Sequence, residues 1–245
     1  MLTTMLRSVR DLYGYRLTGT DGDLGHVHEF YFDDEFWMIR YLVADTGSWL
    51  TGRRVLVSPS AFDEPEWEKR VFPVRLSRQE IEEGPEIEAD EPVSRQHEEA
   101  LSEYFQWAPY WLPGGWAQPV GGAPPSPVRH RGPKGDPHLR STRDVIGYHL
   151  KAADGPIGHV DDFIINDADW AVRYLVVDTR NWLPGKKVLI SPWWVQDIRW
   201  EDSRICVSLT CEQIRRSPPY DFASPVGRDY EDTLFEHYGK PKYWV

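Results

Sequence analysis

One segment of the chain occurs twice, at a constant offset of 133 residues and without a gap. The motif Leu-Arg-Ser at 6–8 returns at 139–141, and Arg-Tyr-Leu-Val at 40–43 returns at 173–176. Roughly 43 of about 106 aligned positions are identical. The repeat indicates a tandem duplication of one folding unit, so the two copies are expected to share one fold.

The repeat divides the chain into two predicted domains, residues 6–111 and 139–244, with residues 112–138 between them. The intervening segment is rich in proline and glycine and lacks apolar periodicity, which is typical of a solvated tether. It carries a small basic cluster that could contact an acidic partner or the acidic first copy. The cluster consists of Arg129, His130, Arg131 and Lys134.

Composition excludes several classes of protein. No stretch approaches the roughly 18 apolar residues of a spanning helix, and the first residues lack the apolar core of a secretion signal. We therefore expect a cytoplasmic protein without a membrane span. Two cysteines can build neither a disulfide framework nor a four-cysteine zinc site. A net charge of -11 disfavours nucleic acid as a partner.

The negative charge is uneven. Residues 6–111 carry 11 basic and 22 acidic side chains, whereas residues 139–244 carry 14 and 16. The first copy could steer basic partners, and the aromatic-rich second copy is suited to packing.

Short runs of aliphatic, β-branched and aromatic residues predict β-strands in both copies. The run 171–178 is apolar on both faces, so we expect both of its faces to be covered. Five or six short strands in about 75 residues favour a small closed barrel, because closure removes exposed edges. The predicted strands are 15–18, 22–33, 38–46, 53–58 and 71–75 in the first copy, and 157–165, 171–179, 187–191 and 204–208 in the second.

Helices are predicted after the strands. Ser77 with Glu80, and Thr210 with Gln213, fit the capping box, so a short helix should follow each pair. A longer amphipathic helix follows in each copy. The expected N-caps of these longer helices are Ser94 and Gly227.

The order of motifs in each copy resembles the PRC-barrel family. The motifs are Leu-Arg-Ser, Gly-His-Val, Arg-Tyr-Leu-Val-x-Asp-Thr and a Ser-Pro that ends a strand, and they cover residues 6–83 and 139–216. The family takes its name from the cytoplasmic barrel of the photosynthetic reaction centre H subunit and includes the C-terminal domain of the ribosome maturation factor RimM. The resemblance implies a mainly β fold of two tandem small PRC-type β-barrels with short helices, and a role in protein docking. The membrane helix of the one parent and the extra barrel of the other are expected to be missing here, so neither parental role transfers directly.

His26 and His159 are candidate titrating residues, since both stand in Gly-His-Val. Imidazole and carboxylate side chains suit zinc binding or proton transfer. Strand alternation, however, predicts that His26 and His28 share a face that Glu29 does not. We interpret both histidines as hydrogen-bonding residues at strand starts and expect no metal site. Their polar neighbours are His28, Glu29, Asp161 and Asp162.

Arg40 and Arg173 are candidate interaction residues on the central strand of each copy. Asp45 and Asp178 stand five positions further on, hence on the opposite face, so no intrastrand pair is expected. Each arginine forms either a structural ion pair or a contact between barrels or with a partner.

Tryptophans supply the other candidate contacts. Trp49 and Trp182 are matched between the copies, whereas Trp193 and Trp194 replace Ser60-Ala61. The extra pair indicates either an internal contact between barrels or an external partner.

No catalytic residue, cofactor or metal ligand is predicted, because the chain has no Gly-x-Ser-x-Gly elbow, Walker lysine loop or dinucleotide fingerprint. We expect a non-enzymatic adaptor or scaffold that docks a protein partner, with the copies packed about a pseudo-twofold axis and homo-oligomers possible. The alternatives are a reaction-centre-related assembly or proton-handling factor, and a ligand-binding or enzymatic site between the barrels.

Overall fold

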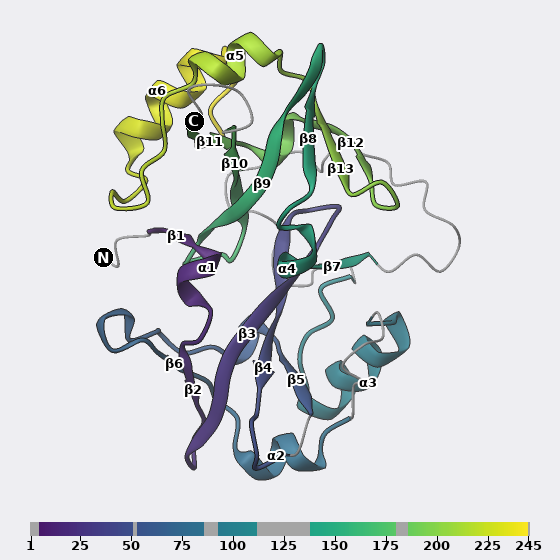
Figure 1. Ribbon diagram of the computed structural model, residues 1–245. Helices are drawn as coiled ribbons and strands as arrows, with labels where there is room; N and C mark the ends of the chain where they lie inside the picture. Colours follow the sequence, from purple (N-terminus) through teal and green to yellow (C-terminus); the bar gives the residue numbers. More distant parts are fainter. Residues whose placement is uncertain (1–4, 51–52, 86–92, 112–137, 180–185, 245) are drawn as a thin grey trace.

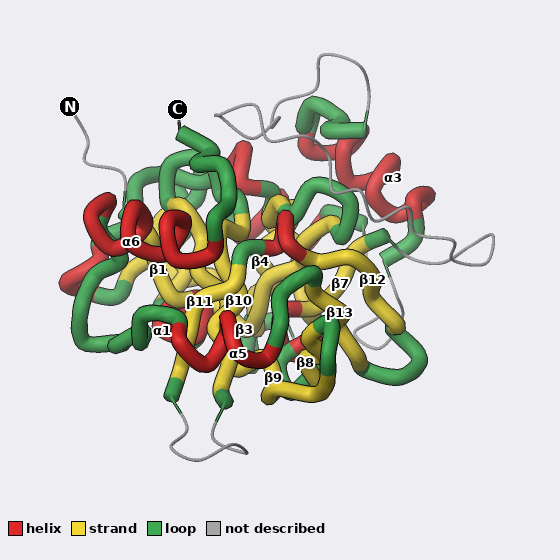
Figure 2. Tube along the Cα trace, turned by 90° about the horizontal axis from the view of Figure 1, so that it is seen from above, coloured by secondary structure: helices red, strands yellow, loops and turns green. Residues whose placement is uncertain are grey.

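The computed structural model describes residues 5–50, 53–85, 93–111, 138–179 and 186–244. The fold is mainly β, with two mixed sheets stacked along the long direction of Figure 1, two short helical turns where the halves meet and the other helices on the outer sides (Figures 1 and 2). Across these ranges, every helix is too short or too polar to span a membrane.

The first sheet has the strand order β5-β4-β3-β2-β6. Its neighbours pair antiparallel except for β2 and β6, which are parallel. Strand β4 is buried along its length apart from its last residue. The strands are β2 (Arg16–Thr18), β3 (Asp23–Asp33), β4 (Met38–Asp45), β5 (Arg54–Val57) and β6 (Val71–Pro73).

The second sheet has the order β11-β10-β9-β8-β13-β12. Strand β10 is buried at every residue, which confirms the prediction drawn from its two apolar faces. Strands β8 and β12 were not predicted. The strands are β8 (His149–Ala152), β9 (Gly155–Asn166), β10 (Val172–Asp178), β11 (Lys187–Ile190), β12 (Val195–Arg199) and β13 (Arg204–Val207).

All nine predicted strands are present, but the sheets are not closed barrels. Among the described strands, the hydrogen-bonded neighbours follow an open path from β5 to β6 and from β11 to β12. A 3-10 helix follows β5 and β11, at Pro59–Ala61 and Pro192–Trp194, and turns the chain away from the sheet edge.

Each sheet receives one further strand from the other half of the chain. Strand β1 (Leu6–Ser8) pairs with β9, and β7 (Leu139–Ser141) pairs with β3 (Figure 1). A single helical turn follows each strand: α1 (Val9–Leu12) and α4 (Thr142–Val145). We call residues 6–12 and 139–145 the exchanged segments.

The two sheets also meet where β4 and β10 begin. Met38 and Ala171, which are 133 positions apart, form an antiparallel bridge. The Ile39 amide donates to the Trp170 carbonyl at 2.9 Å, and the Val172 amide donates to the Trp37 carbonyl at 2.7 Å. Each half therefore makes the same contact with the other.

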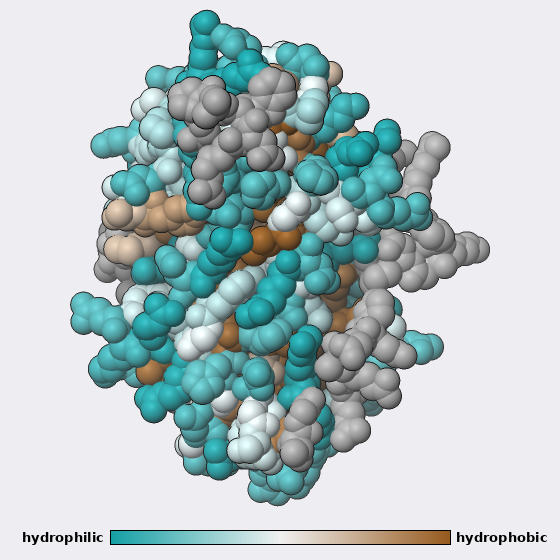
Figure 3. All heavy atoms as spheres, viewed as in Figure 1, coloured by the Kyte–Doolittle hydropathy of each residue, from teal (hydrophilic) through white to brown (hydrophobic). Residues whose placement is uncertain are grey.

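Aromatic side chains fill the space between the sheets. The ring of Trp170 lies 4.9 Å from Phe62, 5.6 Å from Phe72 and 6.4 Å from Phe30, measured between centroids. Trp170 belongs to the second half and the three phenylalanines to the first, so one apolar core extends through both halves. In Figure 3, hydrophobic residues show through the mostly hydrophilic face near the middle of the molecule.

The predicted helices are present with their caps. Both capping boxes form, at Ser77 with Glu80 and at Thr210 with Gln213. Ser94 accepts a hydrogen bond from the His97 amide at 3.3 Å, as expected of an N-cap. The helices are α2 (Arg78–Glu83), α3 (Arg95–Phe105), α5 (Cys211–Arg216) and α6 (Arg228–Tyr238).

Candidate functional site

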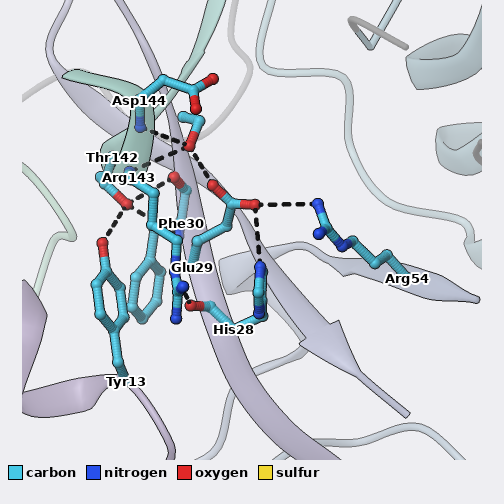
Figure 4. Close-up of polar contacts among 9 residues, drawn as sticks. Tyr13, His28, Glu29, Phe30, Arg54, Thr142, Arg143 and Asp144 are labelled. Carbon is cyan, nitrogen blue, oxygen red and sulfur yellow. Dashed lines mark hydrogen bonds and ion pairs between the residues drawn. The ribbon is translucent and has the colours of Figure 1, made fainter. Parts of the chain in front are cut away.

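The exchanged segments place hydroxyl groups against a buried carboxylate of the opposite half, at two positions. In the first junction, Ser141 meets Glu29, and in the second, Ser8 meets Asp162 (Figure 4 shows the first). The two carboxylates stand 133 positions apart, and they are only 4% and 0% exposed. These junctions bring polar side chains of both halves together.

Ser141 links the halves at the first junction because its hydroxyl has two tasks. Its Oγ donates to Glu29 Oε2 across the junction. The same oxygen accepts from the Arg143 amide at 3.1 Å and the Asp144 amide at 3.2 Å, which makes Ser141 the N-cap of α4. Helix α4 and the carboxylate of β3 are thus fixed by one side chain.

Thr142 adds a second link to β3. Its Oγ1 accepts from the Phe30 amide at 3.1 Å and donates to the Phe30 carbonyl at 3.0 Å. Because this donation uses the threonine proton, the Tyr13 hydroxyl, 2.8 Å away, donates to Thr142. Burial raises the pKa of Tyr13 to about 12, so its proton is retained at neutral pH.

Cations surround the outer side of the first junction (Figure 4). Arg54 Nη1 lies 3.6 Å and His28 Nε2 lies 3.8 Å from Glu29 Oε1, and Arg143 Nε donates to the His28 carbonyl at 2.8 Å. Burial raises the pKa of Glu29. Burial, together with Arg143 and Arg54, lowers the pKa of His28. Glu29 and His28 are therefore both biased towards their neutral forms.

The second junction centres on Asp162. Its Oδ2 accepts from Ser8 Oγ at 2.5 Å, and its Oδ1 accepts from the amides of Arg10 at 3.1 Å and Phe163 at 2.7 Å. Burial nevertheless raises the pKa of Asp162 to about 6, because the free-energy cost of desolvating the carboxylate exceeds the stabilisation that these hydrogen bonds give it.

Asp161, beside it, neutralises two cations. Its Oδ1 lies 3.1 Å from Arg10 Nη1, and its Oδ2 lies 2.6 Å from Lys187 Nζ. At the repeat offset of 133 positions, Arg10 corresponds to Arg143 and Lys187 corresponds to Arg54.

An arginine closes the outer edge of each junction. Arg7 Nε lies 3.0 Å from Asp167 Oδ2, with its guanidinium 3.7 Å from the Trp67 ring centroid. Arg140 repeats this arrangement with Asp34 at 2.9 Å and with Trp200 at 4.0 Å. Each arginine joins a tryptophan of its own half to a carboxylate of the other half.

The structure corrects the expected facing of His28 and Glu29. Strict alternation along β3 predicted opposite faces, yet the two side chains approach to 3.8 Å. The cause is a β-bulge: Val27 pairs with Ala44 and Glu29 pairs with Val43, so His28 is passed over in the ladder.

The candidate titrating histidines stand at the far end of the same strands. His26 is exposed and pairs in register with Asp45, and His159 is half-buried and pairs with Asp178. His159, Asp161 and Asp178 bring one possible ligand atom each within 4.8 Å of one another. Asp161 already contacts Arg10 and Lys187, however, so a metal ion here would be held close to two cations that repel it.

Arg40 and Arg173 are both internal, and of their two expected roles it is the ion pair that the structure supports. They are 3% and 4% exposed. Arg40 Nε lies 2.5 Å from Asp33 Oδ2, and Arg173 Nη2 lies 2.5 Å from Asp169 Oδ2. These are the structural ion pairs that the sequence interpretation offered as one of the two roles.

The tryptophan candidates differ in position. Trp194 is 5% exposed, with its ring 5.3 Å from Phe235 and 4.7 Å from Tyr238, so it is an internal contact that supports α6. Trp193 is half-buried, and its ring lies 5.1 Å from Tyr243.

Trp49 is half-buried too, with its indole N–H donating to the Leu24 carbonyl at 3.3 Å. Trp182 lies outside the described residues.

Sequence reasoning did not single out Ser8, Ser141 or Thr142. A usable signal exists, since each Leu-Arg-Ser is followed by an aspartate three positions after the serine, the pattern of a capped helix start. That signal predicts the helical turn. It does not reveal which half the preceding strand will join.

The arrangement at both junctions is suited to holding two halves together. Ser8, Ser141 and Thr142 are already hydrogen-bonded to groups of the opposite half. Comparison of the chain with models of protein families and with curated proteins found no match.

Proposed function

We propose that the protein is a non-enzymatic docking scaffold of the cytoplasm, built from two units of PRC-barrel type, each with an open sheet, that arose by internal duplication. The proposal of duplication is supported by contacts that recur at the offset of 133. Arg7 with Asp167 recurs as Arg140 with Asp34, and Met38 meets its own counterpart. An isologous dimer interface joined into one chain has this pattern of reciprocal contacts.

The reciprocal exchange of β1 and β7 is the observation that supports a scaffold most directly. It ties both halves into one body, so that surfaces of different character are held at a fixed spacing. Residues 6–111 carry a net charge of -11 and residues 139–244 carry -2. A rigid molecule with one strongly acidic end and one nearly neutral end can bind two surfaces of different chemistry.

Crosslinked capture tests this role. The intact tagged protein is recovered from its own cells after mild crosslinking, and its companions are identified by mass spectrometry. Each candidate is then purified and mixed with the scaffold. We expect a partner that binds at a fixed stoichiometry and associates more slowly as salt rises, because the acidic half attracts it over distances that salt screens. If the protein is recovered only by itself, or if purified candidates fail to bind, the docking role is wrong.

The salt dependence of the association rate also shows which half of the protein binds the partner. A partner bound by the nearly neutral half should associate at a rate that changes little between 50 mM and 500 mM salt, because that half carries almost no net charge to screen.

A further inference from the structure

The segments that follow α3 and α6 are anchored in the same way. Glu98 and Glu231, both buried, accept hydrogen bonds from Tyr110 at 2.6 Å and from Tyr243 at 2.7 Å. The next residue in each half is a tryptophan, and an arginine of the helix lies over its ring. Arg95 is 4.2 Å from the centroid of Trp111, and Arg228 is 4.3 Å from that of Trp244.

In the second half, Lys242 lies between helix α6 and Trp244. Lys242 Nζ donates to Asp232 Oδ1 and, at 3.3 Å, to Glu236 Oε1. The same ammonium is 6.0 Å from the ring centroid of Trp244. The hydrogen bond to Asp232 raises the pKa of Lys242. Two carboxylates one helical turn apart and an indole face thus hold one cation.

Behind α3, the carboxylates are present and the lysine is not. Glu99 and Glu103 stand 133 positions before Asp232 and Glu236, but Pro109 takes the place of the lysine. Glu99 and Glu103 are exposed, and neither carboxylate has an ion-pair partner within the described ranges. A groove of about 580 Å³ lies here, lined among others by Glu99, Glu103, Trp107, Pro109 and Trp111.

We propose that this α3 groove binds a lysine or arginine side chain of a partner protein, in the position that Lys242 takes behind α6. The assignment rests on the docking function proposed above and names the chemistry of its partner. Two carboxylates spaced by one helical turn can share a cation, and an indole face attracts it further. The surrounding half is strongly acidic, so a basic segment is also drawn towards the groove over longer distances.

A pair of peptides supplies the probe. One is a blocked octapeptide of alternating arginine and glycine, and the other has citrulline, a neutral analogue of nearly equal shape, at each arginine. Each is titrated into the full-length protein labelled with ¹⁵N, and the indole N–H signals of Trp107 and Trp111 are followed by NMR. We expect the arginine peptide to shift both signals in a saturable way and the citrulline peptide to leave them in place.

Two variants locate the binding. Glu99→Gln with Glu103→Gln keeps the shape and removes both charges, and should weaken binding of the arginine peptide at least about fivefold, since each exposed ion pair contributes up to a comparable factor. Pro109→Lys supplies the side chain that the other half already has. It should fill the groove from within and abolish the shifts.

The α6 side offers the matched control. Lys242→Ala removes the internal occupant and should create a second site, seen as new shifts of the Trp244 indole signal when the arginine peptide is added. Lys242 is half-buried and its ion pairs join only α6 and the residues after it, so circular dichroism of the variant should match that of the wild type.

Equal shifts with both peptides, or undiminished binding by the Gln and Lys variants, would overturn the proposal. Tighter peptide binding after Arg129, Arg131 and Lys134 are changed to Gln would assign the groove to the chain's own residues 112–137 and would also overturn it.

The peptide experiment is independent of the capture experiment. If a captured partner binds the Glu99→Gln, Glu103→Gln variant unchanged, the docking role stands and the groove assignment fails. If the peptide binds as expected while capture and reconstitution yield no partner, the docking role fails and the groove remains a cation site.

Discussion

The two junctions share a backbone arrangement and differ in charge. In both, a three-residue strand crosses to the opposite sheet and a serine hydroxyl donates to a buried carboxylate. Beside that carboxylate, the first junction has His28 where the second has Asp161. Asp161 neutralises Arg10 and Lys187, whereas the corresponding pair, Arg143 and Arg54, faces an imidazole. Strand exchange therefore depends on the serine and the backbone pairing more than on the outer charges.

A second difference shows how one junction compensates for a change of side-chain length. The Phe163 amide donates to Asp162 of its own strand, whereas the equivalent Phe30 amide donates to Thr142 of the opposite half. Glu29, one methylene longer than aspartate, still accepts from Ser141, but the Phe30 amide donates to Thr142 and not to Glu29. The position of Thr142 is taken by Val9 in the second junction. Glutamate with threonine and aspartate with valine are thus two solutions to one hydrogen-bonding requirement.

The largest expected effect concerns the charge of Asp162. A carboxyl whose pKa is raised to about 6 in the folded state binds its proton more tightly there than in the unfolded chain, where its pKa is 3.8. Its contribution to stability is complete below pH 3.8 and is lost as the pH rises through 6. Relative to Asp162→Asn, the free energy of unfolding of the wild type should fall by about 2.4 kcal/mol between pH 4 and 7. Urea titrations at each pH measure it, and parallel profiles would contradict it.

Asp161→His converts the second junction to the composition of the first. Arg10 and Lys187 then lose their shared carboxylate, and we expect a loss of about 2 kcal/mol at pH 7, between the values for exposed and buried pairs. Chemical denaturation measures the loss, with Asp161→Asn as a control for shape. Unchanged stability would mean that the two cations are adequately solvated without the carboxylate.

Thr142→Val converts the first junction towards the second without the compensating aspartate. The Phe30 amide and carbonyl and the Tyr13 hydroxyl lose their partner, so stability should fall by about 1.5 kcal/mol. Thr142→Ser keeps the hydroxyl and should lose much less. If valine and serine destabilise equally, the methyl group rather than the hydroxyl is the important contact.

The smallest effect is the reverse exchange, His28→Asp. A carboxylate placed between Arg54 and Arg143 should raise stability by about 0.5 kcal/mol at pH 7, because the site is partly exposed. The gain should grow as the pH falls below 6.5, since the lowered pKa of His28 shows that its protonated form is disfavoured in the folded state. Thermal unfolding at pH 5.5 and 7.5 checks this, and a gain that shrinks at low pH would contradict it.

The local parts of the fold could be predicted from the sequence. Strand β10 has apolar residues on both faces, and Ser77 and Thr210 begin capping boxes, so their structure follows from residues close in the chain. The exchange of β1 and β7 could not be predicted, because three residues pair equally well within a half or across halves. The prediction that His28 and Glu29 lie on opposite faces assumed regular alternation along β3. The bulge at His28 interrupts that alternation, and the sequence gives no sign of it. Trp194 is buried only because α6 returns over it, which is a long-range contact.

The reciprocal exchange sets an order in which the molecule can be completed during synthesis. Ser8 leaves the ribosome early, but Asp162, to which it is hydrogen-bonded, follows 154 residues later. At ordinary rates of translation this is a delay of roughly 8 to 30 seconds. The first sheet likewise waits for β7. Each half therefore needs a strand of the other for its native pairing: β3 keeps an unpaired edge until residues 139–141 emerge, and β1 stays unpaired until β9, residues 155–166, follows.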